Sequence, residues 1–360
     1  KNKMFCAFFA TSLFQLFLGP IVFWPLFGSM CLFTLFSVIK HIIARQKYMT
    51  PDAPNLPLGK KRQVSMRPEW RAQLANSKKA GTEQLNAESL DFTVCHWLAT
   101  SALLVPYESC VQFVDSKTEV SNKKDFVLSS QEKQHSVIHG KYNRFFFNGG
   151  VSKGADASQA MPKRIQRVLK GYGAVLARVV PVLHSLLPNV VAGMVAVLEH
   201  GFLYSYTLDE LFAELSPSEG SSMARVPLLG KIFLWHWFEE REHCTESSYL
   251  FFYHYKSSSV PYLLLAVAPA SFFWFTTKFV GLLMAVLAQP FRLPFHLIDF
   301  LRAVVADDSF IMASVYYLLM QSWAKTEHTK EQIQAYANRY KKLYGDDMFA
   351  EKVFLTGDAA

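Results

Sequence analysis

The sequence predicts an all-α protein: a helical bundle flanked on both sides by hydrophobic segments that associate with a membrane. Apolar residues recur at helical spacing through much of residues 92–258, and no sustained alternation of polar and apolar residues predicts strands. Hydrophobic residues make up 51% of the chain and charged residues only 18%, against roughly a quarter charged in ordinary soluble domains. This balance favours a membrane or a large buried interface.

The first predicted unit, residues 1–45, is a transmembrane anchor. Residues 4–39 contain no charged residue, and about 20 apolar residues suffice to span a bilayer. One span is therefore expected, with two short spans or a soluble core helix as alternatives. Pro20 and Pro25 would kink a single helix or turn a re-entrant hairpin.

An extended connector is predicted over residues 46–91, where Pro51, Pro54 and Pro57 precede a polar run. The bundle itself is predicted over 92–258. Hydrophobic and amphipathic helices that pack on the bundle or the membrane follow at 259–345, and a tail at 346–360 ends the chain.

The apolar stretch 260–291 contains Pro261, Pro269 and Lys278. A lysine near the middle of a spanning helix costs roughly 2.5–3.5 kcal/mol on insertion scales. We therefore expect a broken, interfacial or partner-covered segment first, and a true membrane span second.

Charge and cysteine usage restrict the partners. The net charge is +8, but no RNP-like, zinc-finger or helix-turn-helix signature is present, so nucleic acid is not an expected partner. Membrane lipids and other subunits of a membrane complex are the expected ones. The five cysteines are widely spaced, which argues against a disulfide framework and a structural zinc site.

Two short segments carry metal-binding residue types. In 131-QEKQHSVIHGKYN-143, Glu132, His135 and His139 have spacings that place them on one face of a helix. A second segment, 235-WHWFEEREH-243, repeats this arrangement; its metal-binding residue types are His236, Glu239, Glu240 and His243.

Lone glutamates precede both segments in apolar helical surroundings, Glu108 before the first and Glu199 before the second. Along the chain the order is therefore E, E-x-x-H, E, E-x-x-H, as in ferritin-like di-iron proteins, whose helices supply these six ligands to two metal ions. Such groups cannot be buried together without metal ions or protons to neutralise them. The sequence thus predicts a dinuclear site, with iron favoured and manganese or zinc as alternatives.

The motifs resemble those of the predicted metal-dependent hydrolase family, a bacterial group with a ferritin-like helical fold. The similar strings are Pro106-Tyr107-Glu108, Gln131 to Asn143, Leu198-Glu199-His200 and Trp235 to His243. The resemblance implies as metal ligands Glu108, Glu132, His135, Glu199, Glu240 and His243. It implies as additional ligands or supporting partners His139, His200, His236 and Glu239. The family usually has glycine before the first Glu; here we expect Tyr107 to narrow or occupy the site.

Two functions follow as expectations. The first is a membrane-attached enzyme whose dinuclear site performs hydrolysis or oxygen-dependent chemistry on a lipid-like substrate, although the sequence assigns no catalytic residue. The second is a non-catalytic accessory subunit of a mitochondrial inner-membrane complex that retains the metal-binding bundle as a folding staple. Access distinguishes them, because an enzyme needs a path to the metals, whereas a staple can be sealed.

Overall fold

The computed structural model describes residues 85–116, 128–147, 160–205, 208–217, 221–324 and 330–344, together with parts of 32–50. These residues are helical apart from loops, turns and one antiparallel pair of two-residue strands, β1 (Met49–Thr50) and β2 (Trp323–Ala324). The predicted all-α class is confirmed. Some side chains inside these ranges, including those of residues 241–246, are outside the described part.

Nine α-helices with assigned bounds lie in the described part of the chain. They are α4 (Phe92–Ser116), α5 (Leu128–Phe147), α6 (Lys163–Leu186), α7 (Pro188–Ser205), α8 (Leu208–Leu215), α9 (Pro227–Tyr255), α10 (Ser259–Ala288), α11 (Leu293–Leu319) and α12 (Lys330–Tyr344). Short 3₁₀ helices at η4 (Ser222–Arg225), η5 (Lys256–Ser258) and η6 (Pro290–Arg292) connect some of them.

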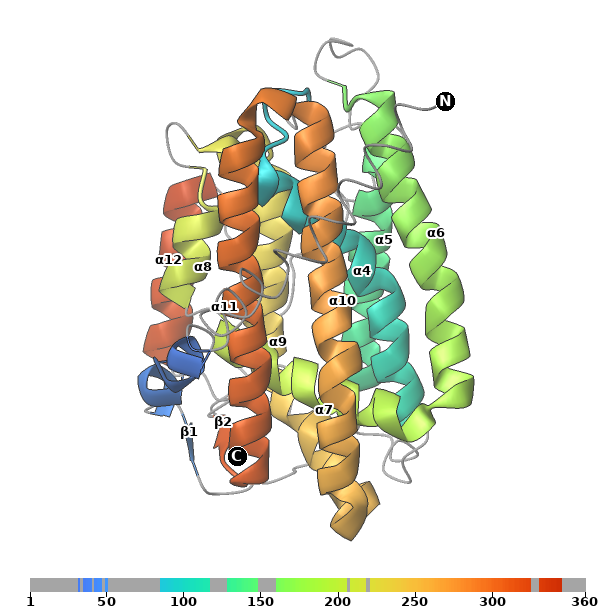
Figure 1. Ribbon diagram of the computed structural model, residues 1–360. Coiled ribbons are helices and arrows are strands. Elements are labelled where there is room, and N and C mark those ends of the chain that lie inside the picture. Colours follow the sequence, from blue (N-terminus) through green and yellow to red (C-terminus); the bar gives the residue numbers. More distant parts are fainter. Residues whose placement is uncertain are drawn as a thin grey trace, which may run out of the picture.

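The helices α4 and α7 form the middle of the bundle (Figure 1). The hairpin of α10 and α11 packs on one side of them, and α5 and α9 pack on the other. Helix α6 lies at one edge beside α4, whereas α8 and α12 lie at the opposite edge (Figure 1). This arrangement gives α4 and α7 two buried sides.

Proline determines where two of these helices begin. Pro188 starts α7 directly after α6, and the two helix axes differ by 118°. Pro227 starts α9. Proline is tolerated in the first turn because its missing N–H would have no partner within the helix there.

The 260–291 segment departs from its prediction. Helix α10 is continuous through Pro269, so the broken form of the segment is wrong, while the interfacial and partner-covered forms stay predictions. Lys278 is buried, and its ammonium lies 5.4 Å from the centre of the Trp274 ring and donates to the Trp274 carbonyl at 3.5 Å. These contacts offset part of the cost of burying the charge.

Among the described residues, α10 alone is long and apolar enough to cross a membrane, and the bent pair of α6 with α7 also passes if it is taken as one span. However, 44% of the most apolar stretch of α10 is buried inside the bundle. The core helix of a soluble protein can have the same length and apolar composition, so these two properties alone do not distinguish a membrane span from a core helix.

The flanking units are described only in part. In the predicted anchor, residues 35–40 and 42–46 are helical, and Arg45 pairs with Glu210 of α8 at 2.8 Å. In the predicted connector, residues 51–84 lie outside the described part, but Leu85 and Leu90 are fully buried. Residues 1–31 and the tail 346–360 also lie outside it.

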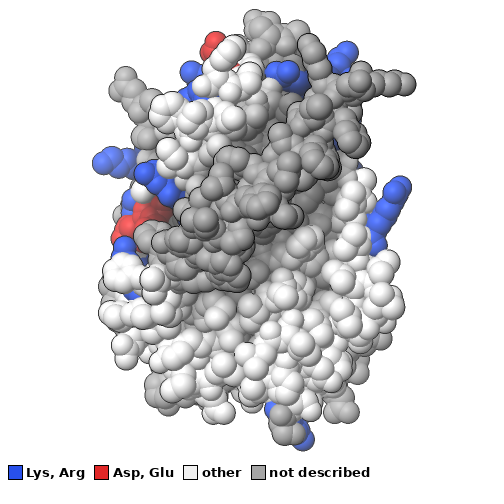
Figure 2. Space-filling model, in the orientation of Figure 1, with Lys and Arg blue, Asp and Glu red and all other residues white. Residues whose placement is uncertain are grey.

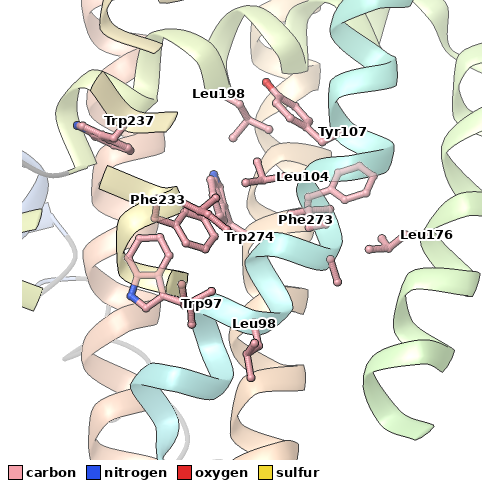
Figure 3. Close-up of a cluster of buried hydrophobic side chains, with 14 of the residues drawn as sticks. Trp97, Leu98, Leu104, Tyr107, Leu176, Leu198, Phe233, Trp237, Phe273 and Trp274 are labelled. Carbon is pink, nitrogen blue, oxygen red and sulfur yellow. The ribbon is translucent and has the colours of Figure 1, made fainter. Parts of the chain in front are cut away.

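Buried aromatic and aliphatic side chains surround the middle helices. Figure 3 shows Tyr107 of α4 facing Leu198 of α7, with Trp274 of α10 nearby. On the other side of α4, the rings of Trp97 and Phe233 pack with centroids 4.5 Å apart. The site described next therefore lies inside a buried, close-packed core.

Candidate metal centre

Four helices contribute to one buried polar cluster. Helix α4 supplies Glu108, and α7 supplies Glu199. Helix α5 supplies Glu132, His135 and His139, whereas α9 supplies His236, Glu239 and Glu240. Each of these side chains is at most 4% exposed.

The cluster contains two groups of potential metal ligands. One consists of Glu108, His135, His236 and Glu240, and the other of Glu132, Glu199 and Glu240. Within each group the candidate ligand atoms lie within 4.8 Å of one another. Glu240 belongs to both groups, which is the position of a carboxylate that bridges two ions.

His135 has one nitrogen facing the cluster and one held from behind. Its Nδ1 lies 3.0 Å from Glu240 and 3.5 Å from Glu132, while its Nε2 lies 3.0 Å from Glu239. Metal-binding imidazoles characteristically have their second nitrogen fixed by a carboxylate in this way. Glu239 thus orients His135.

His236 is held by a chain of hydrogen bonds that fixes its tautomer. Asn143 Nδ2 donates to the Ser101 carbonyl at 2.9 Å, so Asn143 Oδ1 accepts from Ser101 Oγ at 2.8 Å. The single hydroxyl hydrogen of Ser101 is used in the bond to Asn143, so Ser101 Oγ can only accept in its second hydrogen bond, which comes from His139 Nδ1 at 2.9 Å. Burial lowers the pKa of His139, which is therefore neutral, and its Nε2 accepts from His236 Nδ1 at 2.8 Å.

As a consequence, His236 has an unprotonated Nε2 nitrogen that faces two carboxyl groups. Burial also lowers the pKa of His236, so the ring is neutral and its only hydrogen lies on Nδ1. Its Nε2 lies 2.6 Å from Glu240 Oε1 and 3.6 Å from Glu108 Oε1. All three atoms are acceptors, so a proton or a metal ion must lie among them.

The carboxyl groups are strongly perturbed. Burial, with Glu132 nearby, raises the pKa of Glu108 well above its ordinary value. Burial, with Glu240 and Glu132 nearby, does the same to the pKa of Glu199. In the absence of metal these groups therefore hold protons more tightly than ordinary carboxyls do, and a cation would have to displace those protons.

The chemistry of the donor set fits two divalent ions. The carboxyls of Glu108, Glu132, Glu199 and Glu240 would together carry a charge of −4, which two such ions balance. Mixed carboxylate and imidazole ligands suit iron, manganese or zinc. The cluster can thus hold metal, and its geometry leaves the identity of the metal open.

Tyr107 closes the side of the cluster next to α7. Its hydroxyl donates to Glu199 Oε1 at 2.7 Å. The ring is buried, and burial raises the pKa of its hydroxyl well above the ordinary value, so it acts as a neutral donor. This contact matches the expectation that Tyr107 narrows the site.

Five of the six predicted ligands come together. His243 lies on α9, but its side chain is outside the described residues. His236 was expected only as an additional ligand or supporting partner, yet it belongs to the first ligand group. His139 and Glu239 support the two histidines, whereas His200, although buried on α7, belongs to neither group.

Comparisons with protein-family models, with curated proteins and with solved structures find no match. The resemblance to predicted metal-dependent hydrolases therefore stays a prediction, as do its implied ligand roles. The structure itself shows a helical protein with a buried histidine and glutamate cluster that could bind metal.

Proposed function

We propose that this chain is a membrane-attached, ferritin-like helical protein that binds two metal ions, iron in the first instance, and acts on a lipid-like substrate. The observation that carries the proposal is the convergence of the His236 Nε2 nitrogen and the Glu108 and Glu240 oxygens inside the buried core. The four-helix origin of the ligands supports the ferritin-like assignment.

The roles of the side chains follow from their contacts. Glu240 belongs to both ligand groups, His135 and His236 would each hold a metal ion through the nitrogen that faces the cluster, and the Tyr107 hydroxyl donates to Glu199. When bound, a metal pair supplies either activated water for hydrolysis or redox chemistry with oxygen. The surrounding apolar core excludes bulk water from these groups.

Membrane attachment is supported by the exposed side of α10. Apolar side chains on that side are between 43% and 61% exposed: Val260, Leu264, Leu265, Phe272, Phe275 and Phe279. Figure 2 shows charged side chains along the upper part and both edges of the visible face, while the described surface of its lower half is mostly uncharged apart from basic side chains at the lower end. A patch of this kind favours contact with lipid or with a partner subunit. The charge-free segment at 4–39 adds to this argument.

A second function is favoured by the burial of the ligands. Glu132, His135 and Glu199 are fully buried, and the cavity between α4, α5 and α6 is lined by none of the candidate ligands. A sealed metal pair suits a non-catalytic accessory subunit of a membrane complex, such as one of the mitochondrial inner membrane. In that role the metal contributes folding free energy.

Metal content per chain tests the proposal. Elemental analysis of the full chain purified in mild detergent should give about two ions per chain, the number set by the two ligand groups. Glu132→Ala and Glu240→Ala should lose metal, and Glu240→Ala should lose more because both groups share it. Glu214→Ala is the matched control, since this glutamate binds the Trp97 indole at 2.8 Å and lies outside both groups.

Wild-type protein without stoichiometric metal would refute metal binding. If metal is present, the response of the iron-loaded protein to azide separates the two functions. A rapid optical change would indicate an open coordination position reachable from solvent and support an enzyme. An unchanged spectrum would support the sealed accessory subunit.

A further inference from the structure

A cavity of about 330 Å³ lies between α4, α5 and α6. Its lining includes Ala102, Val105 and Pro106 of α4, Asn143 of α5 and Ala177 of α6. Its volume is at the lower end of the range of about 300–1,000 Å³ that is typical of small-molecule pockets. Among the described residues, no charged side chain lines it.

Small residues create this space. Gly140 of α5 and Gly173 of α6 face it, and a Cβ added at Gly140 would meet only Val105 Cγ2, at 4.0 Å. The cavity, called the groove from here on, therefore has mostly apolar walls. Larger residues in place of the two glycines would fill part of its volume. Such a shape suits a narrow, flexible hydrocarbon chain better than a rigid ring system.

A positive charge lies beside one of the residues that line the groove. Arg144 is exposed on α5, and its Nε donates to the carbonyl of the lining residue Gly140 at 3.2 Å. This bond holds the guanidinium next to the groove, where it complements a carboxylate. A mostly apolar space with a cation beside its lining matches a molecule with an apolar tail and an anionic head.

The groove also contacts the hydrogen-bond chain that supports the metal cluster. Asn143 lines the groove and accepts from Ser101, which in turn accepts from His139. His139 holds His236. An occupant of the groove therefore lies three side chains away from a candidate metal ligand.

We propose that this groove binds a medium-chain fatty acid, with its carboxylate at Arg144 and its acyl chain between α4 and α6. The inference deepens the proposed function by naming the lipid-like molecule, and it rests on that function only for the role of the occupant. Binding itself needs no metal, so the two proposals can fail separately.

The test uses the full chain in lipid nanodiscs and a photoreactive dodecanoate, with cross-linked peptides mapped by mass spectrometry. We expect labelling of α4 and α6 at residues that line the groove, and competition by unlabelled fatty acids. Each added CH₂ in the competitor should strengthen binding about fourfold until the groove is full. Metal content measured on the same samples reports separately on the proposed function.

Matched variants locate the site. Ala177→Trp fills the groove from an exposed position and should reduce labelling at least tenfold. Val175→Trp is its control, because Val175 is 57% exposed on the same helix but does not line the groove. Both changes lie near the surface, and thermal unfolding checks that each variant folds.

A second pair tests the head group. Arg144→Gln should weaken dodecanoate about tenfold and leave dodecanol unaffected. Arg164→Gln should change neither, because Arg164 is exposed on the opposite side of α6 from Gly173. Equal labelling of wild type and Ala177→Trp would overturn the proposal, as would labelling spread over the exposed face of α10 or a groove closed to the probe by another segment of this chain.

Discussion

Helices α4 and α7 each face two regions built on different physical principles. Toward α5 and α9 they present Glu108 and Glu199 to other acids and to histidines. Toward α10 the contact is close and apolar: a Cβ added at Gly193 of α7 would lie 2.8 Å from the Tyr262 carbonyl oxygen. Both regions are buried, but buried carboxyl groups gather in the first, whereas the second contains the cation Lys278 and His96, whose pKa is lowered by burial and by Lys278.

The stability of each region depends on a different physical condition. The acidic region is stable only while protons or cations neutralise its carboxyls. The region along α10 depends on close approach of backbones and contributes no residue to either group of potential metal ligands. Removal of metal should therefore act on the first region, and changes in side-chain volume on the second. The three predictions below use this separation.

The largest expected effect is the pH dependence of the metal-free protein. The pKa values of Glu108 and Glu199 in the folded state lie well above the ordinary 4.5. Above pH 4.5 these two carboxyls then bind more protons in the folded protein than in the unfolded chain, so their contribution to stability is greatest below that pH and falls as the pH rises through the raised pKa values. A carboxyl whose pKa is higher by one in the folded state than in the unfolded chain loses about 1.4 kcal/mol of stability across this rise in pH.

Thermal unfolding between pH 5 and pH 8, with and without metal, measures this effect. We expect the melting temperature to fall with rising pH only after the metal has been removed by a chelator. Bound metal would neutralise the ionised carboxylates, so their ionisation would not destabilise the fold. The double variant Glu108→Gln/Glu199→Gln mimics the protonated state and should remove most of the slope. Identical pH profiles for the metal-free wild type and this variant would contradict the prediction.

The sequence predicted which residues form the acidic region, but not the roles of its individual histidines. The spacing of Glu132, His135 and His139 requires them to share one helix face, and the structure places all three in the cluster. The role of His236 could not be ranked against that of His243 from spacing alone, because both lie within one turn of Glu240. The tautomer chain through Ser101 depends on the register between α4 and α5, which no local pattern encodes.

The apolar region was harder to predict for the same reason. Lys278 and Pro269 suggested a broken segment, because local rules count the cost of each residue without its tertiary contacts. In the folded chain Trp274 covers the lysine, and α10 continues. Likewise, the groove beside Gly140 exists only because α5 and α6 meet α4 at small residues.

The next effect concerns His139, which holds His236 from behind at 2.8 Å. His139→Ala removes the acceptor that keeps the His236 hydrogen on Nδ1, so we expect metal affinity to fall about 10- to 100-fold. Competition with a chelator of known affinity measures it. His184→Ala is the control, since His184 stacks on Phe113 away from the cluster; equal affinities in the two variants would refute the role of His139.

The smallest effect compares two glycines in helix interiors. A Cβ at Gly281 would lie 2.8 Å from His96 Cα, which is backbone that cannot yield locally, whereas a Cβ at Gly171 would meet nothing within 4 Å. Both Gly→Ala changes carry the same helix-propensity gain of about 0.5–1 kcal/mol, so their difference isolates the packing between α10 and α4.

We expect Gly281→Ala to destabilise the fold by about 1–3 kcal/mol and Gly171→Ala to stabilise it slightly, as measured by denaturant unfolding of the metal-loaded protein. Because the acidic region lies on the other side of α4, both variants should keep the metal content of the wild type. Loss of metal in Gly281→Ala alone would mean that α4 transmits strain from its apolar side to Glu108, and that the two regions are coupled.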